Sequence, residues 1–431
     1  MTASTLTLPQ RRGACPGLSA PMATGDGLLV RLLPIGTIAL DAFAALCAAA
    51  RQHGNGIVEV TSRGSIQIRG LSAASAPRFA AAVAALGIAA GDGIPVLTDP
   101  LAGLTSDEII DPTVLAADLR AALAQSSLAQ SLSAKVSVTI DGGGTLSLDR
   151  LAADVRLHAV SVDGVAALCV SVGGDGKSAF PIGCIAVQDG VEVTRRLFDI
   201  IARRGHHARA RDIVAAEGIA VFRSAAEDLL VASAPPRWRG NELKELIGAH
   251  SLSDGTFAHG VGLAFGHADA ASLQRLTEAA KAAAARGMRA APGRTLMIVG
   301  LTQQAAPSFA AAAEALGFIV RADDPRRHVV ACAGAPICAS AIIAARAIAP
   351  EIAAAAAPHL DGSFQIHISG CTKGCAHPAP AALTIVGTSS GCALVANGST
   401  RDTPFKIVAT NELPAAVAEM VRGLKRENNH V

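Results

Sequence analysis

The alternation of apolar and polar positions along the chain predicts two copies of one short series of elements. An apolar segment at 28–33 leads into positions 40–51, where apolar residues recur every three or four places, as on one face of a helix. An apolar segment at 261–265 leads in the same way into a helical pattern at 271–286. In each copy we expect a strand ending in Gly-Leu to follow, and then a second helix. The pattern therefore predicts two strand–helix–strand–helix units.

Direct sequence similarity supports the two copies. Residues 70–88 read GLSAASAPRFAAAVAALGI and residues 300–318 read GLTQQAAPSFAAAAEALGF, with 11 of 19 positions identical and no gap. Alanine accounts for several of these identities, and matched Gly, Leu, Pro and Phe residues account for the others. Two similar units 230 positions apart predict an internal duplication with a pseudo-twofold arrangement.

The segments that follow the two copies differ in their cysteines. Residues 100–200 contain an acidic helix start, SDEIIDP, and strand-like patterns around 135–140, 145–148 and 167–172. The second copy is followed by residues 332–375, which contain two cysteine pairs that the earlier segment lacks. A chain of 431 residues is also too long for a single core. We therefore expect several domains, of which only the last binds a metal centre.

Composition indicates an ordered globular protein and excludes several classes of partner. Hydrophobic residues make up 51% of the chain and charged residues 17%, and a net charge of +2 provides no basic surface for nucleic acid or an anionic membrane. The N-terminal sequence lacks the apolar stretch of a signal peptide. The most apolar segment, at 339–357, is interrupted by Arg346, Pro350 and Glu351, so we do not expect it to cross a bilayer. We expect a cytoplasmic protein.

Four of the nine cysteines form two closely spaced pairs. Cys332 and Cys338 are a C-x5-C pair in ACAGAPIC, and Cys371 and Cys375 are a C-x3-C pair in SGCTKGCAHP. Four converging thiolates select zinc or an iron–sulfur cluster, and the five-residue spacing is wider than structural zinc sites usually have. We interpret them as ligands of a [4Fe-4S] cluster; the alternative is four buried cysteines in an alanine-rich core. The remaining cysteines have no paired spacing and are expected in the core or in loops: Cys15, Cys47, Cys169, Cys184 and Cys392.

With these motifs, the chain resembles the sirohaem sulfite and nitrite reductase family along nearly its whole length. The resembling stretches are RRGACPGLSAPMATGDGLLVRLLP near the N-terminus, DPLAGL at 99–104, ACAGAPICASA at 331–341, and SGCTKGCAHP with LTIVG at 369–387. The resemblance implies an α+β fold with a pseudo-twofold axis. It would contain duplicated ferredoxin-like half-domains and two nitrite/sulfite reductase-type α/β domains.

The same resemblance divides the chain into four parts. They are an N-terminal segment with the first ferredoxin-like half at 1–92, a first cluster-type α/β domain without a cluster at 93–205, the second ferredoxin-like half at 206–320, and the [4Fe-4S]-binding α/β domain at 321–431.

Within that family the sequence is most similar to the precorrin-3B synthase branch. The reductases hold sulfite or nitrite with four basic side chains, and here Leu33 occupies the first of these positions. The region of the second contains Asp92 and Asp99 and no cation. Of a Lys-x-Lys pair only Lys135 remains, and it is a candidate catalytic residue. Carboxylates in place of cations repel an anionic substrate, which argues against an oxyanion reductase.

The residues that hold the tetrapyrrole in this family are better preserved. A Thr-x-Arg-x3-Gln motif reads TSRGSIQ here, so Arg63, Gln67 and Arg69 are expected to alternate along one strand and share a face. In the second half, Arg294 and His259 fall at related positions. Arginine suits the acetate and propionate arms of a precorrin because its planar fork binds carboxylates in bidentate fashion. The alternatives are a solvated strand face for the arginines and a structural role for His259.

The resemblance implies a monooxygenase that converts precorrin-3A and O2 to precorrin-3B in aerobic cobalamin biosynthesis, by meso-carbon hydroxylation and γ-lactone formation. It implies a [4Fe-4S] cluster, a mononuclear non-haem iron and no permanently bound sirohaem. Electrons would come from an NADH-linked reductase or a ferredoxin-like carrier. Such an iron favours histidine and carboxylate ligands, and His377, two residues after Cys375, is the strongest candidate for a catalytic role. The other candidate histidines are His206, His207, His259 and His367.

Two other functions remain open on the sequence. One is a sirohaem-dependent sulfite or nitrite reductase, which a haem absorption band would support. The other is a non-catalytic iron–sulfur protein that carries tetrapyrroles, which would return precorrin-3A unchanged.

Overall fold

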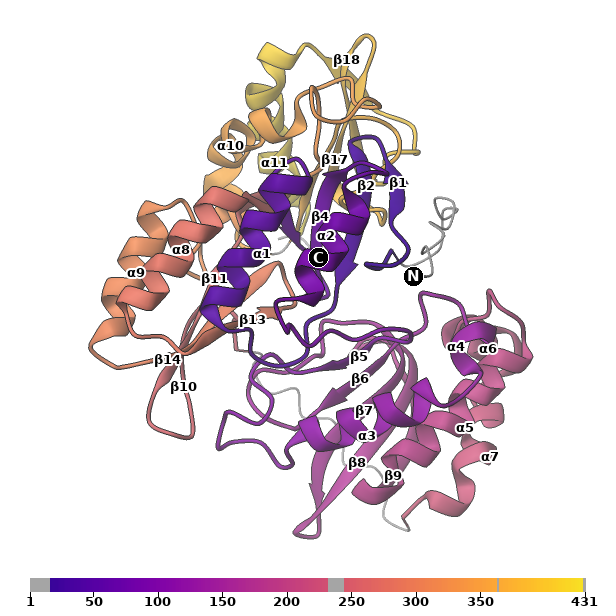
Figure 1. Cartoon of the computed structure of the whole chain (residues 1–431). Coiled ribbons are helices and arrows are strands. Elements are labelled where there is room, and N and C mark those ends of the chain that lie inside the picture. The colour runs from indigo at the N-terminus through magenta and orange to yellow at the C-terminus, as the bar shows by residue number, and fades with distance from the viewer. Residues whose placement is uncertain (1–15, 232–243, 363, 429–431) are drawn as a thin grey trace.

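The computed structural model describes residues 16–231, 244–362 and 364–428, and two of its four sheets belong to the duplicated halves (Figure 1). The first half comprises β1 (Met22–Thr24), β2 (Gly27–Leu32), α1 (Leu40–His53), β3 (Ile57–Val60), β4 (Ile66–Leu71) and α2 (Ala76–Ala84). The second comprises β10 (Gly248–Ser251), β11 (Phe257–Gly262), α8 (Ala270–Ala282), β13 (Gly287–Ala291), β14 (Thr295–Leu301) and α9 (Ala305–Ala315).

Strand order confirms the duplication and corrects its details. The second sheet has the order β10-β11-β14-β13, and the first has β1-β2-β4-β3 with a fifth strand, β12 (His267–Asp269), at its edge, so four strands correspond one by one. Each copy, however, has two strands between its helices, where the sequence pattern predicted one. The first of them, β3 or β13, is only 4 or 5 residues long and forms a tight antiparallel hairpin with the next. A run this short gives too weak an alternation to be recognised in the sequence.

The two halves share one core. Helices α1 and α8 lie side by side (Figure 1), and Phe43 and Leu276 belong to the same buried cluster. Each half also contributes a short segment that pairs with an edge strand of the other half. Strand β12 (His267–Asp269), just before α8, pairs with β3, while Ile38, just before α1, pairs with Met288 on β13. This reciprocal exchange is the arrangement that a pseudo-twofold axis between the halves produces.

The other two sheets belong to two α/β domains with one topology. The first sheet is β5 (Val96–Thr98), β6 (Val138–Asp141), β7 (Ala153–Val162), β8 (Val165–Gly174) and β9 (Phe180–Ala186). The second is β15 (Val329–Ala331), β16 (Ile366–Ser369), β17 (Ala381–Thr388), β18 (Gly391–Gly398) and β19 (Lys406–Val408). In each sheet the first three strands run parallel and the remaining pairs are antiparallel. The duplication therefore extends to these domains.

Helices cover each of these sheets. In the first domain, α3 (Pro112–Ala124) and α5 (Gly190–Arg203) contribute to the core, and α4 (Leu128–Ser131) lies beside them. In the second, α10 (Ala345–Ala356) and α11 (Leu413–Asn428) do so. The acidic segment starts α3 as expected: Asp111 accepts a hydrogen bond from the Thr113 N–H, and Pro112 occupies the first turn.

The first α/β domain is longer than expected. Helices α6 (Ala210–Glu217) and α7 (Ala220–Ala226) pack into its core, Ile213 and Phe222 among their buried residues. The expected boundary at residue 205 is therefore too early, because the apolar faces of these helices have their partners in this sheet. The core continues to about residue 230, close to the end of the first described range.

Residues 145–148 form a loop and not the strand that the sequence suggested. Leu146 and Leu148 are nevertheless buried, which explains the strand-like alternation. The loop takes its shape from a carboxylate: the Leu148 N–H donates to Asp141 at 2.8 Å.

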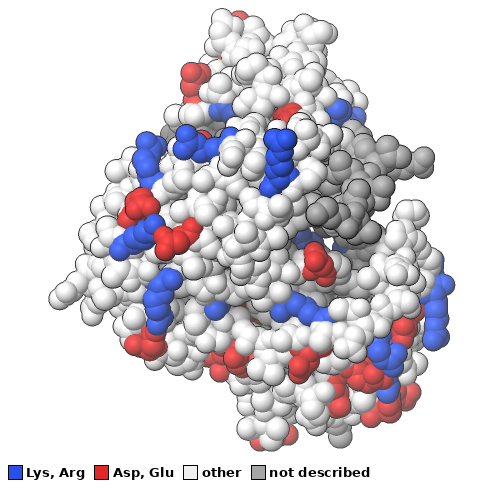
Figure 2. Space-filling view, viewed as in Figure 1, with Lys and Arg blue, Asp and Glu red and all other residues white. Residues whose placement is uncertain are grey.

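On the face drawn in Figure 2, the described residues form no wide area of a single charge. Lys, Arg, Asp and Glu side chains are interspersed over the face in Figure 2. Among the helices of the described ranges, none combines the length and the apolar character needed to cross a membrane. Cys15 and the start of the N-terminal stretch of resemblance lie outside the described residues.

Candidate functional site

The two cysteine pairs meet at the carboxyl ends of neighbouring parallel strands. Cys332 follows β15 and Cys371 lies in the loop after β16, and these strands pair side by side. The Gly370 N–H donates to Cys332 Sγ at 3.1 Å. Cys375 lies close enough to the other three cysteines for their charges to affect it. The structure therefore brings the four predicted ligands together, at the sheet edge where α/β domains commonly bind ligands.

Glycines allow the backbone to approach the sulfur atoms closely. Gly334 and Gly374 have φ of +69° and +63°, a conformation that favours glycine. A Cβ on Gly25, in the turn between β1 and β2, would lie 2.3 Å from Cys338 Sγ. The Ala339 N–H also donates to the Gly25 carbonyl at 2.8 Å. The first half of the protein thus helps to hold the cysteine loop.

The spacing of the four thiols suits a cluster better than a single ion. Zn–S bonds of about 2.3 Å place tetrahedral sulfur atoms about 3.8 Å apart. No three of the four sulfur atoms, all of them in described loops, lie within 4.8 Å of one another. Burial raises the pKa of the Cys332 and Cys375 thiols, and the neighbouring cysteines act in the same direction. The thiolates therefore need a positively charged group between them, and a cubane fits the wider spacing.

A cavity of about 290 Å³ lies against the cysteines. One wall is the face of the first-half sheet that carries Arg31 and Gln67, which are register partners on β2 and β4, and Arg69 two residues further along β4. The opposite wall includes Cys332 and Cys375. Gln67 and Arg69 therefore share a face, as predicted.

Arg69 is already paired with carboxylates of the protein. Its Nε and Nη2 donate to Asp26 at 2.7 Å each, and Nη1 lies 3.4 Å from Glu59. Arg346, on α10 of the cysteine-bearing domain, donates to Glu59 at 2.7 Å. Burial tends to lower the pKa of Arg69, but the hydrogen bond with Asp26 and the charge of Glu59 raise it above its usual value. Arg69 thus supports the cavity wall with its guanidinium paired to carboxylates of the protein, and a role in binding a substrate stays a prediction.

Arg63 lies at the tip of the β3–β4 hairpin, off the strand on which it was expected. Its Nη2 donates to Ser137 Oγ at 2.8 Å and to the Ala152 carbonyl at 2.7 Å. The tip meets the corresponding hairpin of the second half, where the Gly293 N–H donates to the Ser62 carbonyl at 3.0 Å. Arg63 lines the cysteine-side cavity and also adjoining cavities of about 320, 220 and 380 Å³. It stands where the two halves and the first α/β domain meet.

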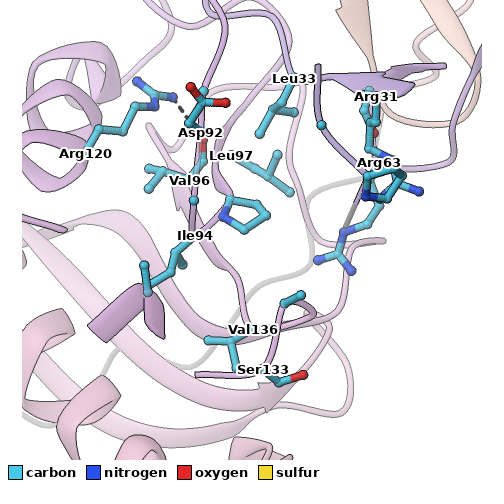
Figure 3. A pocket seen from close by; sticks show the side chains of 18 residues that line it. Arg31, Leu33, Arg63, Asp92, Ile94, Val96, Leu97, Arg120, Ser133 and Val136 are labelled. Atoms are coloured by element: carbon cyan, nitrogen blue, oxygen red, sulfur yellow. Dashed lines mark hydrogen bonds between the residues drawn. The ribbon is translucent and has the colours of Figure 1, made fainter. Parts of the chain in front are cut away.

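The adjoining cavity of about 320 Å³, drawn in Figure 3, is called the apolar chamber below. Arg31 and Arg63 lie together on one side of it, and Arg120 lies on the other, donating to the Val96 carbonyl at 2.9 Å. Asp92 is at its exposed rim. Most of the remaining wall is hydrophobic: Leu33, Ile94, Pro95, Val96, Leu97 and Val136.

Lys135 does not contribute to the chamber. Its side chain is exposed, while its neighbours Ala134 and Val136 line the wall. The structure thus places this candidate catalytic lysine outside the cavities around Arg63.

His259 faces the helices of the second half and not the cavity. It pairs with Ile298 on β14, just as Val30 pairs with Ile68 in the first half, so it occupies a core position. Its ring contacts that of Phe309 at 5.9 Å between centroids, and burial lowers the pKa of its imidazole. The expectation that His259 contacts a substrate is therefore wrong, because the residue lies on the opposite face of its strand.

Arg294 and His377 lie near the cavity. Arg294, in the turn before β14 with φ of +63°, lines it and places Nη2 3.5 Å from the Ala376 carbonyl. His377 packs against the fully buried His367, with ring centroids 5.7 Å apart. Neither histidine lines the cavity itself, although Ala376 and Pro378, on either side of His377, do.

The remaining candidate histidines lie elsewhere. His206 and His207 are exposed in the loop before α6, in the first α/β domain.

The sequence analysis did not identify Arg31, Glu59 or Arg346 as residues of this region. For Arg31 and Glu59, the alternation of buried positions along their strands could have indicated that they face the cavity. On β2, Val30 and Leu32 face the core, so Arg31 must face the cavity. On β3, Glu59 lies between the core residues Val58 and Val60 in the same way. Arg346 had no such signal, because its partner Glu59 lies in a different domain.

Comparisons with known proteins identify the family. A nitrite/sulfite reductase ferredoxin-like half domain matches residues 20–86, and a nitrite and sulphite reductase 4Fe-4S domain matches residues 91–232. A precorrin-3B synthase from a Sinorhizobium species is 39% identical over 419 residues, which cover 97% of this chain and 90% of the relative. The chain belongs to the precorrin-3B synthase family. The 4Fe-4S domain match falls on the first α/β domain, so in this family member the domain type occurs there without the paired cysteines.

The two domain matches place the chain within the nitrite/sulfite reductase-like superfamily, and more distant similarities agree with this. A ferredoxin–nitrite reductase of Synechococcus elongatus is 23% identical over 395 residues, covering 85% of this chain and 77% of the relative. The structure of the Mycobacterium tuberculosis NirA protein superimposes with a TM-score of 0.72 at 20% identity, covering 93% of this chain and 81% of that one. The predicted α+β fold of duplicated half-domains and α/β domains is confirmed.

Proposed function

We propose that this protein is an oxygen-dependent precorrin-3B synthase of aerobic cobalamin biosynthesis. The observation that carries the proposal is the pairing of two cavities. One is lined by arginines and by Cys332 and Cys375, and the other is the apolar chamber, which shares Arg31 and Arg63 with the first. The arginines that line the first suit the carboxylate arms of a macrocycle, and the apolar wall of the second suits a small uncharged co-substrate.

Three arginines are the substrate-binding residues we propose. Arg31, Arg63 and Arg294 line the cavity beside the cysteines, from both halves of the protein. Burial lowers the pKa of Arg294, so a substrate carboxylate beside it would relieve an unfavourable desolvation. Arginine forks would fix the carboxylate arms of a precorrin and thereby orient the ring.

The four cysteines are the proposed ligands of the [4Fe-4S] cluster, which transfers single electrons when bound. The proposal includes a mononuclear non-haem iron, for which His367 and His377 are the predicted histidines nearest the cavity. It includes no permanently bound sirohaem. Electrons would come from an external donor, an NADH-linked reductase or a ferredoxin-like carrier.

The wall of the apolar chamber accounts for the choice of co-substrate. Leu33 presents hydrocarbon at one position where the reductases of sulfite or nitrite have a cation, Val136 adds a further apolar side chain, and the Asp92 carboxylate repels anions at the rim. Dioxygen carries no charge and is admitted. One of its oxygen atoms enters the product, and the other leaves as water with two electrons and two protons.

The buried ion pairs hold the site together. Arg346 and Arg69 both contact Glu59, so the sheet that presents Arg31 is tied to the domain that carries the cysteines. This connection keeps the substrate at a fixed distance from the electron-transferring group.

Turnover tests the proposal. The protein is purified without oxygen, assayed for iron and acid-labile sulfide, and then incubated with precorrin-3A, a reductant and ¹⁸O2. We expect a product that has gained one labelled oxygen atom. Recovery of unchanged precorrin-3A, or rapid reduction of sulfite or nitrite by a protein that retains sirohaem, would contradict it.

A matched pair of variants tests the binding residues. Arg31→Gln should raise the KM for precorrin-3A about tenfold or more, because a charge-assisted hydrogen bond is lost. Arg78→Gln, on the exposed surface of α2, is the control and should leave KM unchanged. Equal KM values for the two variants would remove Arg31 from the site.

A further inference from the structure

A row of four reactive side chains crosses the sheet of the first α/β domain, away from the cysteine-lined cavity. Asp141 on β6 is the register partner of His158 on β7, His158 is the partner of Cys169 on β8, and Cys169 is the partner of Cys184 on β9. Register partners on adjacent strands point to the same face. The sequence does not reveal this row. Fourteen residues separate Cys169 from Cys184, and neither belongs to a closely spaced cysteine pair.

The two sulfur atoms of this row are in close contact. Cys169 Sγ lies 2.7 Å from Cys184 Sγ. Directly opposed residues of an antiparallel pair have Cβ atoms about 4.5–5.5 Å apart, close to the range of about 3.5–4.5 Å that a disulfide requires. Cys184 is buried, with 1% of its surface exposed, and Cys169 is half-buried. A small reagent would therefore reach Cys169 first.

The row also contains a proton acceptor. His158 Nδ1 lies 3.4 Å from an Asp141 carboxylate oxygen. Burial, together with the neighbouring Cys184, raises the pKa of the Cys169 thiol, so its thiolate forms little by itself at neutral pH. An imidazole oriented by a carboxylate is the kind of group that takes a proton from a thiol.

We propose that Cys169 and Cys184 are a covalent modification site, which a small-molecule disulfide oxidises reversibly to a cross-strand disulfide with His158 as the proton acceptor. Cys169 loses its proton to His158 and attacks the reagent, forming a mixed disulfide and releasing one small thiol. Cys184 then attacks Cys169 Sγ and releases the second thiol. Two protein thiols are oxidised, one disulfide is reduced to two thiols, and a reducing thiol reverses the reaction.

The cross-link would tie down an edge strand with a structural role. Strand β9 is the last strand of its sheet, and the Val231 N–H donates to the Cys184 carbonyl at 2.9 Å. Leu230 also pairs with Ile185. The end of the first described range is therefore anchored on the residue that the disulfide would immobilise.

Differential alkylation of the complete protein tests the proposal. The protein, with its metal content intact and without oxygen, is incubated with oxidised glutathione, quenched with acid, alkylated and digested. We expect Cys169 and Cys184 in one cross-linked peptide that is lighter by two hydrogen atoms and that dithiothreitol resolves. Recovery of both residues alkylated, or a glutathione adduct on Cys169 that never resolves, would overturn the proposal.

Variants separate the roles within the row. Cys184→Ser should stop at the glutathione adduct on Cys169, and Cys169→Ser should show neither product. Cys392→Ser, which removes a buried cysteine of the other α/β domain, is the control and should oxidise like the unmodified protein. His158→Asn should slow the oxidation at least about tenfold without changing the product. An unchanged rate in a folded His158→Asn protein would exclude it as the proton acceptor.

Discussion

The two α/β domains have the same strand order, yet the loops that follow their first two strands are organised by different chemistry. In the first domain, Asp141 accepts hydrogen bonds from the N–H groups of Gly143 and Leu148 and from the Ser147 hydroxyl. In the second, cysteines and glycines occupy the equivalent ends of β15 and β16. The buried Asp141 carboxylate thus organises the loops of the first domain, and the cysteine thiols occupy the equivalent loops of the second.

In both domains, the loops at this edge of the sheet have to satisfy backbone polar groups that the sheet does not pair. Loops after parallel strands need an internal partner for their polar groups, because the backbone there is not paired in the sheet. A carboxylate that accepts several N–H groups can be that partner, and so can a cluster held by thiolates. The same topology therefore accommodates two different kinds of chemistry in these loops.

A buried carboxylate beside the cysteine loop, Asp26 in the β1–β2 turn, also differs in charge state from one in the first α/β domain, Asp99. Burial favours protonation of Asp26, but the hydrogen bond and charge of Arg69 outweigh it and lower the pKa of this carboxyl group. In the first α/β domain, burial and the neighbouring Asp141 and Glu108 raise the pKa of Asp99 well above its usual value. Asp26 is therefore kept ionised by the neighbouring Arg69 guanidinium, whereas the surroundings of Asp99 favour its protonated form.

The largest effect is expected from removing a cysteine of the second domain. Cys371→Ser should abolish nearly all iron–sulfur absorption and acid-labile sulfide, since three thiolates hold a cubane poorly. Asp141→Asn, at the equivalent edge of the first domain, is the matched variant and should retain the cluster. An intact cluster spectrum in Cys371→Ser would refute the ligand assignment.

The next effect is expected from the buried ion pairs. Asp26→Asn leaves the Arg69 guanidinium without its bidentate partner, which should lower the free energy of unfolding by about 3–5 kcal/mol. Thermal denaturation measures the loss. The control is Asp41→Asn, which removes an exposed pair with Lys281 and should cost less than about 1 kcal/mol.

Acid denaturation can test whether ionised Asp26 stabilises the folded state. Because its pKa in the folded state is lowered from 3.8, the contribution is present at neutral pH and is lost as the pH falls below that value. Asp26→Asn should therefore be less sensitive to acid in this range. Equal acid sensitivity of the variant and the unmodified protein would indicate that Arg69 does not stabilise the carboxylate.

A smaller effect of opposite sign is expected in the first domain. Burial raises the pKa of Glu108 from 4.5 to about 7, so the folded state holds this proton more tightly than the unfolded state. Stability should therefore fall as the pH rises from 4.5 through 7. Glu108→Gln should reduce this dependence by about 1 kcal/mol, a value lowered for the screening of a half-exposed group. Melting curves at several pH values provide the measurement.

Local patterns allowed much of the fold to be predicted. The matched Gly, Pro and Phe residues of the repeat survive because they fix a strand end and a helix start in both halves. The cysteine pairs were recognised because their ligand spacing lies within a few residues. The β3 and β13 strands were missed because each is short and its hairpin partner dominates the pattern.

The candidate site could be predicted only in part, because its contacts join distant segments. Arg69 was found on the correct face, but its partner Asp26 lies in a turn 43 residues earlier, which no local pattern reveals. His259 lies on the core side of its strand because it follows the same alternation as the core residue Val261, two positions further along β11. Arg63 was expected on a strand, although the Gly64 that follows it, with φ of +80°, belongs to the hairpin turn.

The contact between Gly25 and the Cys338 loop also bears on how the protein matures. The glycine leaves the ribosome long before the cysteines do, so its turn is available when the last domain arrives. Insertion of the metal centre would then stabilise the contact between the Cys338 loop of the last domain and the Gly25 turn near the N-terminus. A protein that lacks the centre should therefore be cut by proteases near its N-terminal turn as well as in the cysteine loops.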